Sequence, residues 1–128
     1  SLMILSFLSA SYSRSIIQLL PVKLKKDYHT NTPSNISFKI LDARLLQDVL
    51  RVEIEFTGKN PYAEYFLYWD GSFLKSNPPQ VNFHLHVVKQ NEGGITKWKE
   101  TRYFNVKMFK GKIIRLYKGK TFFKSFPG

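Results

Sequence analysis

The residues of this sequence with the most suggestive spacing for chemistry are two histidines, His84 and His86. In a strand, residues two apart share one face and lie about 6–7 Å apart. Two imidazoles at that distance can bind one metal ion, with His29, Asp70 or an acid from a neighbouring strand as a further ligand. The alternative is that both are half-exposed polar residues on the outer face of a sheet. Because the chain has three histidines and no cysteine, we expect neither a tightly bound metal nor any other cofactor.

Paired carboxylates are a second candidate. Glu53 and Glu55 share a strand face, and carboxylates held roughly 5–9 Å apart can hydrolyse glycosides. Glutamates that alternate with basic residues are more typical of charge pairing between neighbouring strands. The sequence has no nucleophile elbow, phosphate-binding loop, dinucleotide fingerprint or zinc-finger spacing. We therefore predict that the protein is not an enzyme.

Aromatic and basic residues indicate binding instead. Tyr62, Tyr65 and Tyr68 precede Trp69 in the densest aromatic block of the chain. Exposed on a sheet, the tyrosines would form a platform on which sugar rings or bases stack. The alternative is that the block belongs to the core, where we expect Trp69.

The positive charge is concentrated near the C-terminus. Residues 97–128 carry ten basic side chains and one acid, a net charge of +9, out of +11 for the whole chain. Such a field attracts nucleic acid, acidic glycans or anionic lipid surfaces, although lysines also serve to solubilise strand faces and protect sheet edges. The candidate polyanion-binding residues are Lys110, Lys112, Arg115, Lys118, Lys120 and Lys124. On one hairpin they would form a narrow stripe that binds weakly, without sequence readout and in a salt-sensitive manner.

The element that positions the histidines is the strand predicted over residues 80–88. It follows Pro78 and Pro79, which cannot donate to a β-ladder. Its side chains alternate between apolar and polar, as in a strand with one face in a core and one in water. We expect the apolar set to be buried and the polar set to face away: Val81, Phe83, Leu85 and Val87 against Asn82, His84 and His86.

Strand-like segments recur every 8–14 residues along a single domain, residues 1–128. They predict an all-β fold, an antiparallel Ig-like β-sandwich of seven or eight strands, with a partly open barrel as the alternative. Residues 15–24 contain Pro21 and are expected to form an edge strand or a broken one. Residues 1–2 are interpreted as a cloning remnant. Residues 3–14 are either part of the fold or a residual signal sequence, and their apolar run is too short to span a membrane.

From about residue 36 to 126 the layout resembles a group of small exported or lipid-anchored β proteins of Bacteroidetes-type bacteria. The matching residues are 50–58, Ser76-Asn77-Pro78-Pro79-Gln80, Leu85-His86, Glu100-Thr101 and Phe104-Asn105-Val106. Lys59-Asn60 stand where that group has its first cysteine, and no cysteine follows Gly93-Gly94. The resemblance implies a β-sandwich in the cell envelope or periplasm, or secreted.

Together these features favour a non-enzymatic envelope-associated binding or scaffolding domain, for an acidic glycan or a protein partner. The alternative is a cytoplasmic nucleic-acid-binding β-barrel that uses the basic C-terminal segment.

Overall fold

The computed structural model describes residues 17–89 and 93–127, and the interpretations of residues 1–2 and 3–14 lie outside this part of the chain. It contains eight strands and one short 3-10 helix. They are β1 (Leu19–Leu24), β2 (Lys39–Leu46), β3 (Val49–Gly58), β4 (Ala63–Trp69), β5 (Gln80–Lys89), β6 (Thr96–Asn105), η1 (Lys107–Phe109), β7 (Ile113–Lys118) and β8 (Thr121–Phe126). No helix within the described residues has the length and hydrophobicity needed to cross a membrane.

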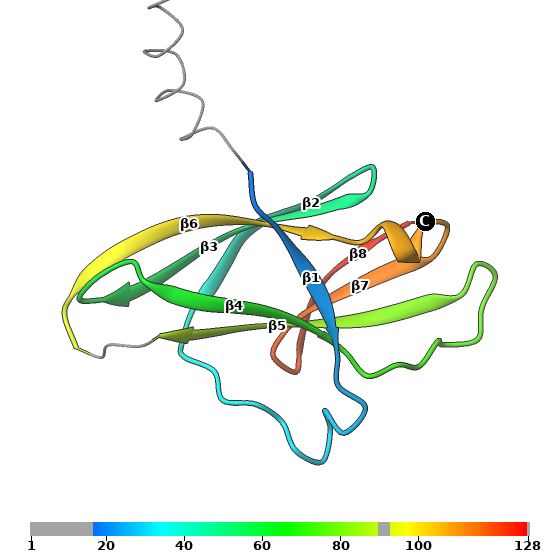
Figure 1. The fold of residues 1–128 in the computed structure, drawn as a ribbon, viewed down its shortest axis with the longest axis horizontal. Helices are drawn as coiled ribbons and strands as arrows, with labels where there is room; N and C mark the ends of the chain where they lie inside the picture. The colour runs from blue at the N-terminus through cyan, green and yellow to red at the C-terminus, as the bar shows by residue number, and fades with distance from the viewer. Residues whose placement is uncertain (1–16, 90–92, 128) are drawn as a thin grey trace, which may run out of the picture.

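The eight strands form one sheet, in the order β2-β3-β6-β1-β4-β5-β7-β8. Figure 1 shows the sheet curling until its two outer strands, β2 and β8, approach one another, and these strands are in contact. The all-β prediction is confirmed. The prediction of a two-layered sandwich is wrong, because a single sheet encloses the core and nearly closes into a barrel. This arrangement agrees with the alternative prediction of a partly open barrel.

The expectation of a purely antiparallel sheet is also wrong. β1 runs parallel to both of its neighbours, β4 and β6, and β5 runs parallel to β7. The chain reaches β7 from β5 by way of β6 and η1, so the parallel pair is joined by a long crossover, as parallel strands require.

The prediction for residues 15–24 was an edge strand or a broken one. β1 lies in the interior of the sheet, so the edge strand is wrong, and the interruption at Pro21 takes the form of a change of partner. Its first half, Leu19 to Pro21, is in register with β6, and its second half, Val22 to Leu24, is in register with β4. The missing amide of Pro21 therefore falls where β1 changes partner. A proline is tolerated at such an interruption of the ladder, whereas a continuous central strand would lose a hydrogen bond.

The core fills the barrel with the apolar set of every strand. On β5 the predicted residues Val81, Phe83, Leu85 and Val87 are all fully buried, so that half of the alternation is confirmed. Facing them are fully buried residues of the other strands, among them Leu50, Val52, Ile54, Leu67, Phe104 and Leu116.

The strand directions define two ends of the barrel. The Trp69 end is where β1, β4 and β6 finish and where β5 and β7 start, so it carries the prolyl segment and η1. The Gly119 end carries the β7–β8 turn and the beginnings of β4 and β6. In Figure 1 the Trp69 end lies on the right, the beginnings of β4 and β6 lie on the left, and the β7–β8 turn lies low in the middle.

A segment without regular structure, residues 25–38, connects β1 to β2 and is called the strap below. Its first amide, on Lys25, donates to the carbonyl of Trp69 (2.8 Å), and the amide of Ile36 donates to the carbonyl of Val87 (2.9 Å). The strap therefore runs from the Trp69 end along β4 and β5 toward the Gly119 end, and Figure 1 shows it in cyan below the barrel.

Candidate functional site

The strap covers the face of β5 on which the histidines lie. His84 and His86 point away from the core, as predicted, but they are not half-exposed: only 3% and 1% of their surfaces remain accessible. Tyr28 of the strap, itself fully buried, lies over both of them. The prediction that this face meets water is therefore wrong, because it is covered by a segment distant in sequence.

Hydrogen bonds define the state of His86. Its Nδ1 lies 3.2 Å from the carbonyl oxygen of Ser34, which can only accept, so Nδ1 carries the proton. Its Nε2 then accepts from the hydroxyl of Tyr28 at 2.7 Å. Burial lowers the pKa of His86 and raises that of Tyr28 to about 12, so both side chains are neutral near pH 7.

His84 is bonded on one side only. Its Nδ1 donates to the carbonyl oxygen of Gly119 (2.7 Å), at a turn whose positive φ of 56° suits glycine. Its Nε2 is buried and has no hydrogen-bond partner in the described part of the chain. Tyr28 stacks on the ring with centroids 4.2 Å apart. Burial lowers the pKa of His84, and the neighbouring His29 lowers it further.

His29 and Asp70, the predicted additional metal ligands, pair with each other at the edge of this cluster. Nε2 of His29 lies 3.0 Å from Oδ2 of Asp70, and the other carboxylate oxygen accepts from the amide and hydroxyl of Ser72. Although burial opposes it, these hydrogen bonds lower the pKa of Asp70. Among the described residues, no group of three acids or histidines is placed to hold a metal ion.

The structure divides the six predicted polyanion-binding residues among four places. Lys110 and Lys112 follow η1 at the Trp69 end, and Lys120 is exposed in the turn at the Gly119 end. Arg115 lies on the outer face of β7, 5.0 Å over the ring of Phe122. The remaining two, Lys118 and Lys124, turn toward β2, so the six do not form one stripe.

Lys118 and Lys124 close the barrel. The Nζ of Lys118 donates to the carbonyl oxygen of Phe38 (3.1 Å), and that of Lys124 donates to the carbonyl oxygen of Ala43 (3.0 Å). Both acceptors lie on β2 or directly before it, across the gap in the barrel wall. β2 and β8 form no ladder with each other, so the carbonyl groups on this edge of the sheet lack a strand partner. The two ammonium groups donate hydrogen bonds to two of these carbonyl oxygens.

The three tyrosines of the predicted aromatic platform are not brought together. Tyr62 is exposed, whereas Tyr65 and Tyr68 are each 7% exposed. Tyr65 belongs to the barrel core, and Tyr68 lies on the other face of β4 beside Tyr28 and His86. Trp69 packs against the core, as expected.

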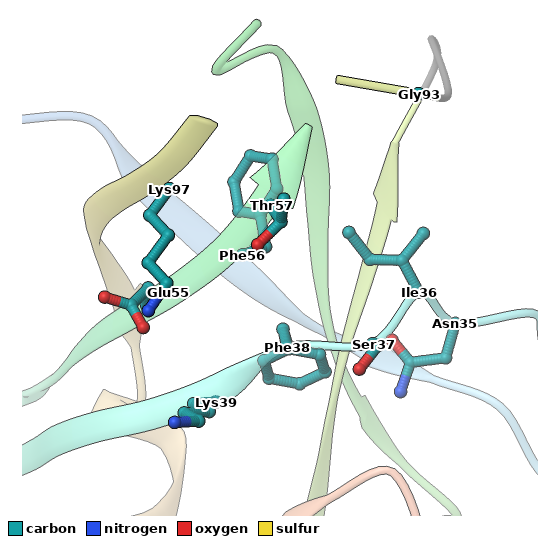
Figure 2. A pocket seen from close by; sticks show the side chains of 10 residues that line it. All are labelled: Asn35, Ile36, Ser37, Phe38, Lys39, Glu55, Phe56, Thr57, Gly93 and Lys97. Atoms are coloured by element: carbon teal, nitrogen blue, oxygen red, sulfur yellow. The ribbon is translucent and has the colours of Figure 1, made fainter. Parts of the chain in front are cut away.

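The two glutamates have different cross-strand neighbours. Glu53 is in register with Asp42 and Thr101, so it faces no base across the strands. Glu55 is in register with Lys39 on one side and with Lys99 on the other, as expected of charge pairing between strands. Together with Lys97 it lines a hollow of about 510 Å³ between the start of β2 and the end of β3, beside the rings of Phe38 and Phe56 (Figure 2).

A larger, mostly apolar groove at the Trp69 end was not predicted from the sequence. It has a volume of about 730 Å³ and is lined by Pro21, Val22, Leu24, Trp69, Asn105, Lys107, Met108 and Phe109. Its signal in the sequence was Met108, an apolar residue placed between two lysines, Lys107 and Lys110, immediately after a strand.

The sequence matches no protein-family model and no curated protein. The fold is similar to the crystal structure of a protein from Parabacteroides distasonis that carries the provisional name of a toxin-related protein, with a TM-score of 0.52 and 11% sequence identity. The match covers 84% of this chain and 59% of the other, so this chain spans little more than half the length of that protein. At this identity the similarity concerns the fold alone.

Proposed function

We propose that this protein is a non-enzymatic binding domain of the cell envelope, and that its partner is an acidic glycan. One observation carries the proposal: the positive charge of residues 97–124 has almost no acidic partner. In the described part of the chain, only Arg102 of this segment forms an ion pair, with Glu100 (3.3 Å). The other nine bases form no ion pair there, although Lys97 and Lys99 lie beside Glu55, and such a field attracts a polyanion.

The location of these bases favours a flexible polymer as the ligand. Lys97, Lys99 and Lys120 are exposed at or near the Gly119 end, whereas Lys107 and Lys110 are exposed at the Trp69 end. Bases spread in this way contact charges along a chain and do not form a compact pocket for a small ligand. Binding is then weak, and it depends strongly on salt because it releases counterions.

The test uses heparin and polygalacturonate as probes, titrated between about 50 and 200 mM salt. We expect affinity to fall steeply over this range, and K97Q/K120Q to weaken binding more than R44Q/K97Q. The second variant removes the same charge, but Arg44 is already paired with Asp42 (3.1 Å). Equal losses in the two variants would contradict the proposal, and tight, salt-resistant binding to one single-stranded oligonucleotide would favour the nucleic-acid alternative.

The envelope location is tested separately. In cells that express the gene with its natural upstream sequence, fractionation is expected to recover the protein with the envelope. Recovery in the cytosol alone would overturn this part of the proposal.

A further inference from the structure

The groove at the Trp69 end exists because β1 changes partner. After Pro21, β1 separates from β6 and pairs with β4. β6 itself ends at Asn105 and the chain turns into η1. The edge of β1 that faces β6 is therefore uncovered from Val22 to Leu24, and the space beside it is the groove of about 730 Å³.

Apolar side chains are exposed around the mouth of this groove. Met108 is 79% exposed and Leu24 is 52% exposed, and both line it. Phe73, 49% exposed, joins them through Trp69, whose ring lies 5.4 Å from that of Phe73 and 4.9 Å from that of Phe109. The apolar surface thus continues from the groove to the segment before β5, and contiguous exposed apolar surface of this kind marks an interaction site.

Bases surround this apolar surface. Lys107 lines the groove, and Lys110 follows within the same turn. Lys112 places its Nζ 5.7 Å from the ring centre of Phe73. None of these three lysines forms an ion pair with a described acid, although Asp48 lines a hollow together with Lys110 and Lys112. We call this surface the Trp69 face: Leu24, Trp69, Phe73, Lys107, Met108, Lys110 and Lys112.

We propose that the Trp69 face docks onto an anionic lipid bilayer. Leu24, Phe73 and Met108 would enter the boundary between headgroups and acyl chains, while the lysines contact the phosphates. A soluble acidic glycan satisfies the lysines but offers no apolar phase to Met108. A bilayer presents negative charge directly above an apolar layer, which is the arrangement that this face complements.

This proposal rests on the envelope location proposed above, which supplies the membrane. It also orients the molecule: with the Trp69 end on the bilayer, Lys97 and Lys120 lie at the opposite end of the barrel, away from the membrane. In the docked molecule the bases of the Gly119 end remain free for the glycan, so K97Q/K120Q tests glycan binding and M108D tests docking.

The experiment is co-sedimentation of the full chain with vesicles of phosphatidylcholine, alone or mixed with phosphatidylglycerol. We expect binding to the mixed vesicles only.

The variants test which side chains carry this binding. M108D should weaken vesicle binding about tenfold or more, as loss of a buried methionine does. I95D is the matched control, because Ile95 is an exposed apolar residue (92%) that directly precedes β6 at the other end of the barrel. K107Q/K110Q should cost about fivefold per lysine, and K97Q/K120Q should cost much less.

Equal losses for M108D and I95D, or binding that does not depend on phosphatidylglycerol, would overturn the docking face. A dimer in solution that M108D dissociates would assign the face to a second copy of the chain instead. If vesicles fail to bind while heparin binds, the docking face is wrong and the glycan proposal stands. If vesicles bind in the expected pattern and heparin does not, the docking face stands and the glycan proposal falls. Thermal melts of both aspartate variants confirm that each is folded.

Discussion

Acid should destabilise this protein through its two buried histidines. In the unfolded chain a histidine has a pKa of about 6.5. In the folded chain burial lowers the pKa of both His84 and His86. At a pH between the pKa of the folded chain and that of the unfolded chain, the unfolded state therefore binds more protons than the folded state. The free energy of unfolding consequently falls as the pH decreases below about 6.5.

The magnitude follows from proton linkage. Each histidine contributes at most about 1.4 kcal/mol per pH unit, so the pair contributes up to about 2.7 kcal/mol per unit. The structure explains why protonation is not accommodated. His86 cannot accept from Tyr28 once Nε2 carries a proton, and a protonated Nε2 on His84 has no acceptor within the described residues. Asp27 and Asp70 do not contribute to this pH dependence. Their pKa values are lowered in the folded protein, so their protonation reduces the free energy of unfolding only below about pH 4.

The assay is urea denaturation at about pH 7.5, 6.5 and 5.5. The double variant H84N/H86Q removes both titrating groups, and we expect its stability to change much less with pH than that of the natural chain. Y28F is the matched control: it disturbs the same cluster but keeps both histidines, so it should retain the pH dependence. An equal slope in the double variant and the natural chain, or stability that increases on acidification, would refute this account.

Three further predictions concern stability at neutral pH, each measured by urea denaturation. Y28F should cost about 1–3 kcal/mol, because it leaves the buried acceptor of its histidine partner unsatisfied; no loss would show that the bond contributes nothing. F83A should cost about 3–5 kcal/mol and I95A less than about 0.5, since Phe83 is fully buried and Ile95 is 92% exposed; similar midpoints would contradict the core assignment. K124M should cost about 1–2 kcal/mol, because it removes a part-buried hydrogen bond from a charged donor to the carbonyl oxygen of Ala43; a larger loss than F83A causes would contradict this estimate.

The alternation of β5 shows what a local pattern can predict. It identified correctly which side chains of the strand enter the core, because that depends only on the period of two. It could not predict the cover on the other face, because Tyr28 lies 58 positions before His86. A polar face without a cover and one buried beneath a distant segment have the same local sequence.

The order of the strands in the sheet was harder to predict from the sequence, for a related reason. Alternation gives the face of each side chain but not the neighbour of each strand. Pro21 was interpreted as the mark of an edge strand or a broken one, since a proline removes one ladder hydrogen bond. In the structure it marks a change of partner inside the sheet, and both situations tolerate the same residue.

The Trp69 face could have been found from a local geometric argument. Residues 107–109 form a 3-10 turn, in which consecutive side chains point about 120° apart. Such a turn cannot direct two adjacent apolar side chains into the same core. Phe109 is buried against Phe83 and Trp69, so Met108 must point away from them into solvent. An apolar residue that the fold directs outward, beside lysines that form no ion pair with a described acid, is consistent with the proposed docking of that end of the barrel onto a membrane.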